Sequence, residues 1–165
     1  MKEAYFAGGC FWCIGGFFEQ MEGVLSVTSG YSGGDEDAPS YEDVKAQRTG
    51  HRETIKIEYD ESKIGYRELL DFFAANVDPF DGGGQFIDRG RSYTLAVYYT
   101  DGAQKKDAQE VVKRIEDESG REVFIAVEPF KSFFEAENHH QHYSLRHPEE
   151  FEKELVESGR KEEKK

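Results

Sequence analysis

The chain holds two cysteines, Cys10 and Cys13, and both lie in one short segment near its start. The only tryptophan, Trp12, stands between them, and pairs of glycines at 8–9 and 15–16 flank the segment. Glycine allows a backbone to approach a ligand closely, and aromatic side chains line apolar pockets. The segment therefore predicts a reactive thiol at the mouth of an apolar pocket.

The residues after Cys10 predict a helix, because the apolar side chains of 11–21 recur at steps of three and four. Cys10 then falls at or just before the helix N-terminus, where the helix dipole and free backbone N–H groups stabilise a thiolate. We expect the pKa of the Cys10 thiol to be lowered and the residue to act as a nucleophile or redox group. The alternative is that Cys10 and Cys13 are small apolar residues of the core.

A metal site is another chemistry open to a Cys-x-x-Cys pair. It would need further ligands, and the only cluster available is His139, His140 and His142. One such pair with one histidine cluster is a weak zinc pattern. We therefore predict no bound metal, with a small Cys/His metal-binding module as a less favoured alternative.

The length and charge of the chain limit its class. With 165 residues it can form one domain with a core of its own, and we expect a single catalytic domain at 1–157 and a polar C-terminal tail at 158–165. The formal net charge of −13 argues against nucleic acid or an anionic membrane as partner. We find only two cysteines, no secretory signal and no apolar run near ~18 residues. These features predict a cytoplasmic protein, which we expect to be a monomer.

Hydrophobic periodicity predicts alternating strands and helices. The predicted strands are 4–7, 23–31, 53–59, 92–99 and 122–127, and the predicted helices are 11–21, 66–76, 103–119, 132–142 and 148–157. This order predicts an α+β fold, a two-layer α/β sandwich with helices on one or both faces. The connections at 32–50 and 78–91 are too long for simple turns, and such loops usually carry function.

Several separate blocks of the chain, in order, resemble the A-type peptide methionine sulfoxide reductases. The first is Gly-Cys-Phe-Trp at 9–12, and the others lie at 27–34, 39–44, 49–53, 78–79, 86–90, 92–93, 136–137 and 140–143. The resemblance implies a ferredoxin-like core and the reduction of methionine S-sulfoxide, free or in proteins, to methionine. It also implies a repair enzyme with no bound cofactor, reduced by thioredoxin or a similar dithiol.

The resemblance assigns catalytic roles to four residues by position. Cys10 would attack the sulfoxide sulfur, and Glu53 would protonate its oxygen with help from the phenols of Tyr41 and Tyr93. A sulfoxide is a poor electrophile until its oxygen accepts a proton, so an acid must stand beside the thiol. Glutamate can serve near neutral pH only if burial raises its pKa. Without the resemblance, Glu53 would be taken for the first surface residue of a strand, and the tyrosines for core or surface aromatics.

Four further residues are candidates for binding the substrate. By resemblance, Phe11 and Trp12 would hold the methyl group, and Asp88 would hold the substrate backbone or an ordered water. His140 is included with them, although a solvated helix face explains this histidine equally well. Asp88 alone could simply form a turn.

The chain departs from the family pattern in having no cysteine after Cys13, where many members carry a recycling cysteine near the C-terminus. The sulfenic acid left on Cys10 can be resolved by Cys13, forming a disulfide, or by an external thiol. We favour Cys13 as the resolving residue. A general Cys-x-x-Cys dithiol-disulfide oxidoreductase is the main alternative, but it leaves Glu53, Tyr41 and Tyr93 without a role.

Overall fold

The computed structural model describes residues 2–157. Within them, one sheet contains β1 (Lys2–Gly8), β2 (Val24–Ser32), β3 (Arg52–Tyr59), β6 (Leu95–Tyr99), β7 (Ile125–Pro129) and β8 (Phe133–Glu135), and a hairpin pairs β4 (Gly84–Gln85) with β5 (Asp88–Arg89). The helices are α1 (Phe11–Glu19), α2 (Tyr41–Lys45), α3 (Tyr66–Ala75), α4 (Gly102–Ser119), α5 (Tyr143–Arg146) and α6 (Pro148–Glu157), with 3₁₀ turns η1 (Arg91–Tyr93) and η2 (Asn138–His140). The tail predicted at 158–165 lies outside the described residues.

The strands of the large sheet lie in the order β7-β6-β1-β3-β2-β8. Neighbouring strands are antiparallel, except that β6 and β7 are parallel. Along the chain, strands and helices alternate in the predicted order, as β1-α1-β2 and then β3-α3-β6-α4-β7. The prediction of an α+β fold is confirmed.

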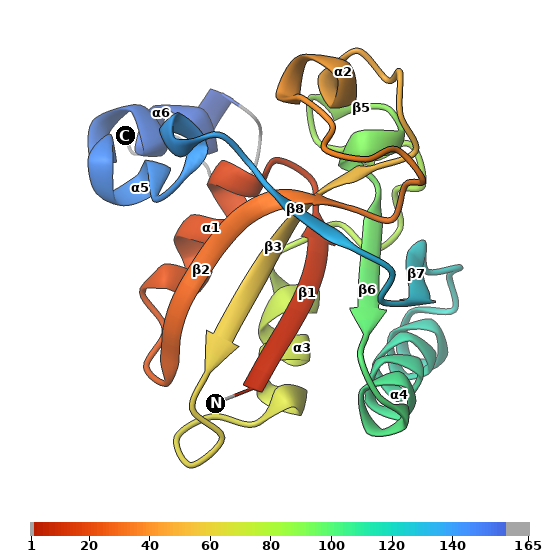
Figure 1. The fold of residues 1–165 in the computed structure, drawn as a ribbon. Coiled ribbons are helices and arrows are strands. Elements are labelled where there is room, and N and C mark those ends of the chain that lie inside the picture. Colours follow the sequence, from red (N-terminus) through yellow and green to blue (C-terminus); the bar gives the residue numbers. More distant parts are fainter. Residues whose placement is uncertain (1, 158–165) are drawn as a thin grey trace.

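The main core lies between the sheet and three helices on one of its faces (Figure 1). Successive residues of a strand point to opposite faces, so Phe6 of β1 packs in this core whereas Tyr5 and Ala7 do not. α1, α3 and α4 fill the core with Phe18, Phe73, Val111 and their neighbours. On the other face, the ring of Tyr5 stacks on that of Phe130, which follows β7, with the ring centres 4.2 Å apart. Tyr5 also contacts the ring of Phe133 in β8.

The segment 132–142 does not form the predicted helix. It contains β8, which pairs antiparallel with β2, and the short turn η2. Gly30 of β2 permits this pairing, because a Cβ there would collide with the ring of Phe133. Pairing along the sheet edge satisfies backbone groups that a helix would have satisfied internally. The prediction that the histidine cluster lies on a helix is therefore wrong.

The two long connections contain short elements that periodicity does not reveal. Segment 32–50 includes α2, whose N-cap Ser40 accepts a hydrogen bond from the Asp43 N–H at 3.1 Å. Segment 78–91 includes the β4–β5 hairpin. The strand predicted from residue 92 begins at 95, after η1, and the one predicted from 122 begins at 125.

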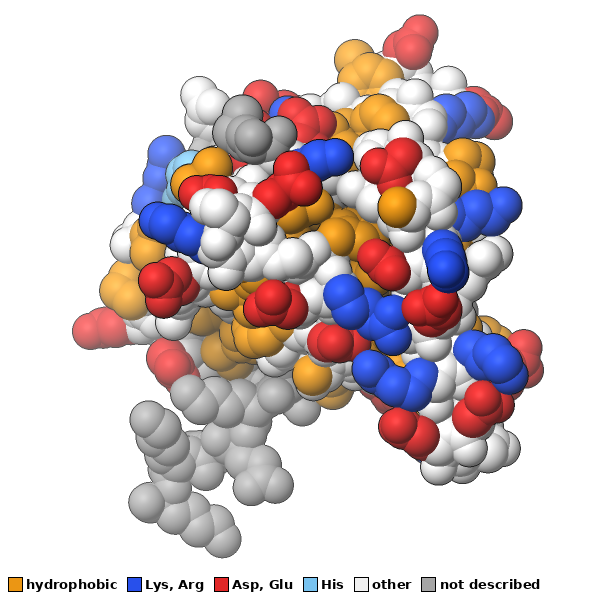
Figure 2. Space-filling view, turned by 90° about the horizontal axis from the view of Figure 1, so that it is seen from below, with side chains coloured by type: hydrophobic (Ala, Val, Ile, Leu, Met, Phe, Trp, Pro, Cys, Tyr) orange, Lys and Arg blue, Asp and Glu red, His pale blue; other side chains and the backbone are white. Residues whose placement is uncertain are grey.

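Charged side chains of both signs are interleaved around hydrophobic patches on the face shown in Figure 2. Between α3 and α4, Arg67 pairs with Glu110 at 2.9 Å and Arg114 pairs with Asp71 at 3.0 Å. Exposed pairs of this kind contribute only about 0–1 kcal/mol each. Across residues 2–157, no helix combines the length and the apolar character needed to cross a membrane.

Candidate active site

The segments that carry most of the predicted site residues meet at one end of the large sheet, at the top of Figure 1, where β1 ends and β3 and β6 begin. The carboxyl end of β1 pairs there with the amino ends of β3 and β6, and Gly8 stands opposite Leu95. Cys10 follows β1, and Tyr93 precedes β6. Glu53 is the second residue of β3, paired with Tyr31 of β2. Antiparallel pairing therefore brings together the segments of Cys10, Glu53 and Tyr93, although these residues are at least 40 positions apart.

Cys10 is the N-cap residue of α1, as the spacing predicts, and Cys13 lies one turn into the helix. The backbone N–H of Cys13 donates to the Cys10 carbonyl oxygen at 3.2 Å. Cys10 is 8% exposed and Cys13 is fully buried, in a small cluster with Phe151 and Leu155 of α6. The two thiols are thus neighbours in a largely dry environment.

The pKa of the Cys10 thiol is raised well above its usual range, so the predicted lowering is wrong. The hydrogen bond between the Cys10 and Cys13 side chains is the largest cause, and burial and the charges of Cys13 and Asp88 add to it. The N–H of Cys13 acts in the opposite direction, as a helix N-terminus should, but it is outweighed. Cys10 is therefore a thiol near neutral pH.

We expect Cys10 to react slowly with iodoacetamide at neutral pH. Its rate should keep rising with pH beyond the value of about 8.5 that is typical of a free cysteine, because only the thiolate reacts. Mass mapping of the peptides, with Cys10 and Cys13 quantified separately, measures this rate. A rate that no longer changes above pH 7 would show that the thiolate already exists in the resting site.

Glu53 is buried, with 1% of its surface exposed, which excludes the alternative of a surface residue. Its Oε1 accepts a hydrogen bond from the backbone N–H of Phe11 at 3.1 Å, so the carboxyl group lies at the N-terminus of α1, beside Cys10. Burial raises its pKa well above the usual range, and the charge of Cys10 raises it further, whereas the Phe11 N–H lowers it. The carboxyl group can therefore hold a proton near neutral pH.

Tyr41 and Tyr93 complete a cluster of ionisable groups around Glu53. Burial raises the pKa of both phenols, and the charge of Glu53 is the next cause for each. Both therefore stay protonated and can donate a hydrogen bond. Asp88, in β5, raises the pKa of Cys10 and of Glu53, so it belongs to the same cluster.

An aromatic wall stands next to this cluster. The Trp12 Nε1–H donates to Nδ1 of His140 at 3.2 Å, and the His140 ring lies 4.3 Å from that of Tyr41 and 5.5 Å from that of Phe11. His140 is 2% exposed, and burial lowers its pKa, with the charge of His139 adding to the effect. A neutral imidazole can accept the indole N–H, so His140 is placed to orient Trp12.

The histidine cluster is not assembled with the cysteines as a ligand set. Among residues 2–157, no three His, Cys, Asp or Glu side chains are arranged to hold a metal ion. His142 instead lies 3.6 Å from a carboxylate oxygen of Glu19, and His140 bonds to Trp12.

The peptide methionine sulfoxide reductase family model matches residues 2–165. The chain belongs to this family. It is 41% identical to peptide methionine sulfoxide reductase MsrA of Bacillus licheniformis over 159 residues, which cover 95% of this chain and 88% of the relative. The enzyme therefore reduces methionine sulfoxide in peptides.

Solved structures of a yeast protein have the same fold as this reductase. Mxr1 from Saccharomyces cerevisiae in reduced form has a TM-score of 0.84 at 28% identity, over 90% of this chain and 86% of that one. Mxr1 in complex with Trx2 has a TM-score of 0.57 at 19% identity, over 81% and 78% of the two chains.

Three residues that are not among the predicted site residues also contact this region, namely Tyr31, Glu137 and Tyr143. Tyr143 stacks on Trp12 with ring centres 4.3 Å apart. Tyr31 is fully buried, and its hydroxyl donates to Glu137 at 3.0 Å. All three lie in the blocks that resemble the family, but nothing in their type or spacing indicates a contact with the residues near Cys10.

Proposed function

We propose that Cys10 is the nucleophile and Glu53 the proton donor when this enzyme reduces methionine S-sulfoxide. The contact between the Glu53 carboxyl and the Phe11 N–H carries the proposal, because it places a buried acid directly beside the N-cap thiol. The raised pKa of Glu53 supplies the proton at the pH where a free glutamate has lost it.

The proposed step conserves atoms and electrons. Glu53 gives its proton to the sulfoxide oxygen, Cys10 attacks the sulfur, and the thiol proton of Cys10 passes to the Glu53 carboxylate. The hydroxyl group then transfers to the Cys10 sulfur as two bonds of the substrate sulfur break, the one to oxygen and the new one to the Cys10 sulfur. The products are methionine and a Cys10 sulfenic acid, so the substrate is reduced by two electrons and Cys10 is oxidised by two. A resting thiol with a raised pKa suits this scheme, because it releases its proton only when the substrate is in place.

We assign the remaining side chains to binding and to stabilising charge. The hydroxyls of Tyr41 and Tyr93 donate to the sulfoxide oxygen as negative charge develops on it. Phe11 and Trp12 form the apolar surface for the substrate methyl group, and Asp88 holds the substrate backbone or an ordered water. His140 is a positioning residue that acts through its hydrogen bond to Trp12.

We propose that Cys13 resolves the sulfenic acid. Its thiol attacks the Cys10 sulfur, water leaves, and a Cys10–Cys13 disulfide forms. The interaction between the two side chains supports this route, because Cys13 is the largest cause of the raised pKa of Cys10 and lies one helical turn from it. A dithiol such as thioredoxin then returns both cysteines to thiols, in a reducing compartment such as the cytoplasm. Either a free or a protein-bound methionine sulfoxide can start the cycle.

The predicted ferredoxin-like core also belongs to this proposal. The order β6-β1-β3-β2 within the sheet, with α1 after β1 and α3 after β3, supports it. Residues 1–157 would form one catalytic domain around that core.

The thiol count after reaction with one equivalent of methionine sulfoxide tests the recycling route. We expect the native chain to lose two titratable thiols and Cys13→Ala to lose only one, because that variant stops at the sulfenic acid. Cys13→Ala should also turn over poorly with thioredoxin but continue with dithiothreitol, which can attack Cys10 directly. Alanine is chosen because serine would bury a hydroxyl at a fully buried position. Normal turnover of Cys13→Ala with thioredoxin would exclude the disulfide as a required step.

A further inference from the structure

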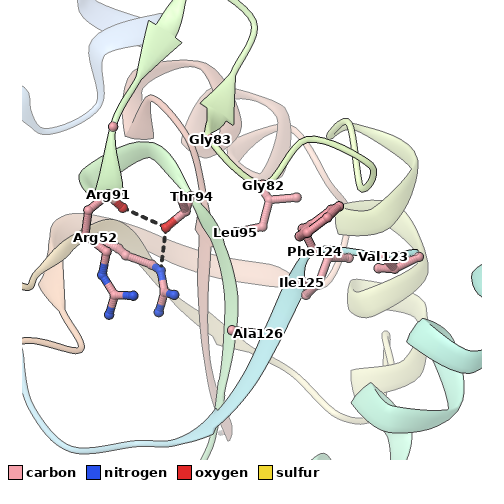
Figure 3. Close-up of a pocket in the computed structure, with 11 residues that line it drawn as sticks. Arg52, Gly82, Gly83, Arg91, Thr94, Leu95, Val123, Phe124, Ile125 and Ala126 are labelled. Carbon is pink, nitrogen blue, oxygen red and sulfur yellow. Dashed lines mark hydrogen bonds between the residues drawn. The ribbon is translucent and has the colours of Figure 1, made fainter. Parts of the chain in front are cut away.

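A pocket lies at the β6–β7 side of the sheet, and its lining includes residues that adjoin Glu53 and Tyr93 in the sequence (Figure 3). Its volume of about 560 Å³ is in the range of small-ligand sites. One part of the lining is cationic, from Arg52 and Arg91. The other part is apolar and includes Leu95, Ile125 and Phe124. Phe124 is 42% exposed, which is high for a large apolar residue.

Arg52 is held firmly in the wall of this pocket. Its side chain is 5% exposed, and its Nε–H donates to Thr94 Oγ1 at 2.8 Å. Its Nη1 donates to the Tyr98 hydroxyl at 3.0 Å and lies 3.3 Å from both carboxylate oxygens of Glu128. The guanidinium group is therefore preorganised, with one carboxylate already opposite it.

Arg91 has no such counter-charge within residues 2–157, where no carboxylate oxygen lies within 4.0 Å of its guanidinium nitrogens. Its Nε–H donates to the Gly50 carbonyl oxygen at 3.2 Å, which leaves the rest of the guanidinium group for a ligand. In Figure 3 the side chains of Arg52 and Arg91 extend to the same side of the pocket. Two arginines and one glutamate leave a local positive charge on a chain with a net charge of −13.

The pocket and the catalytic site are built on the same short segments. Arg52 directly precedes Glu53 in β3, and adjacent strand residues point to opposite sides, so one enters the pocket and the other the catalytic site. Arg91 begins the turn η1 that ends at Tyr93. Each residue of an extended peptide spans at most about 3.3–3.6 Å, so the number of residues between the sulfoxide and a side chain in the pocket is a quantity that peptides of varied spacing can measure.

We propose that this pocket binds an aspartate or glutamate side chain of the oxidised peptide, so that the enzyme prefers methionine sulfoxides with an acidic residue nearby. Arginine binds carboxylates through two parallel hydrogen bonds, and the exposed ring of Phe124 covers the methylene groups. This inference rests on the proposed catalytic role of Cys10, which places the sulfoxide. The net charge of the chain alone would favour basic peptides, so the proposed preference for acidic peptides is the opposite.

Kinetics on matched synthetic peptides test the proposal. Each peptide carries one methionine sulfoxide and one glutamate, placed up to about four residues before or after it, and its control has glutamine in that position. We expect kcat/KM to be about three- to fivefold higher for glutamate at one or two neighbouring positions, as for a half-exposed ion pair. The preference should weaken between about 0.05 M and about 0.5 M salt.

Two variants of Arg91 and one control variant test whether the preference for glutamate arises at this pocket. Arg91→Gln should reduce the ratio of kcat/KM for the glutamate and glutamine peptides towards one, and Arg91→Lys should keep part of it. Arg114→Gln removes the same charge from the α3–α4 surface and should leave the ratio as it is.

Three results would overturn the inference. They are equal kcat/KM for both peptides at every position, a preference spread evenly over all positions, and a preference that survives Arg91→Gln. In each of these cases free methionine sulfoxide is still reduced, so the proposed function stands. If neither the peptides nor free methionine sulfoxide were reduced, the proposed function would fail together with this inference.

Discussion

A Cys10→Ser variant should lose at least about 10³-fold in kcat/KM for methionine sulfoxide, because a serine hydroxyl can neither attack the sulfur usefully nor take up its oxygen. The loss should be the same with dithiothreitol and with thioredoxin as reductant, since it precedes recycling. Single-turnover release of methionine, measured by chromatography, checks the expectation without any reductant.

Cys13→Ala is the control for this variant. It removes the other thiol, three residues along the same helix, and should still release one equivalent of methionine. Methionine release by Cys10→Ser at a rate near that of the native chain would remove Cys10 as the nucleophile. Release by neither variant would mean that both thiols are needed in the first step.

A Glu53→Gln variant should lose about 10²- to 10³-fold in kcat/KM, the size expected for the loss of a positioned acid. Glutamine keeps the shape of the side chain and can still accept the Phe11 N–H, but it has no proton to give. The native activity should fall as pH rises through the raised pKa of Glu53, because deprotonation removes the donor. This decline should be absent from the residual activity of Glu53→Gln.

The same substitution should stabilise the protein at alkaline pH. The pKa of Glu53 is higher in the folded state than in the unfolded state, where it is about 4.3, so the folded state binds more protons. The free energy of unfolding therefore decreases as pH rises from about 4.3 to the raised pKa. Glu53→Gln avoids the buried charge, and thermal unfolding at pH 8 should show a higher Tm for this variant than for the native chain.

Glu58→Gln is the matched control, because Glu58 lies on the same strand but is half-buried and paired with Lys56. It should change neither the activity nor the pH at which activity declines. A Glu53→Gln variant with native activity at pH 7 would show that another group protonates the sulfoxide. A lower Tm for Glu53→Gln at pH 8 would contradict the raised pKa.

The α+β class and the position of Cys10 follow from the sequence alone, because both depend on local patterns. The three- and four-residue spacing after Cys10 is enough to start a helix there, and the glycines before it end a strand. The family blocks identify the reaction. Because the printed sequence has no cysteine after Cys13, a disulfide formed within it must join Cys10 and Cys13.

The ionisation of the site was decided only by the tertiary structure. A dipole argument predicts a thiolate at Cys10, but burial and contact with the Cys13 side chain outweigh it. Likewise Glu53 would be taken for a surface residue, because glutamate is usually exposed. Its burial results from pairing between β3 and both β1 and β2, and from the N–H of a residue 42 positions away.

The wall around Trp12 and the pocket at Arg52 also required the fold. His140 reaches Trp12 only because its segment pairs with the sheet edge as β8, at a place where Gly30 leaves room, and does not form the helix that its periodicity favours. Spacing along a chain determines which residues share a helix face or a strand face. Which faces then meet, and how much water they exclude, depends on contacts between distant segments, and those contacts set the pKa values and the shape of this site.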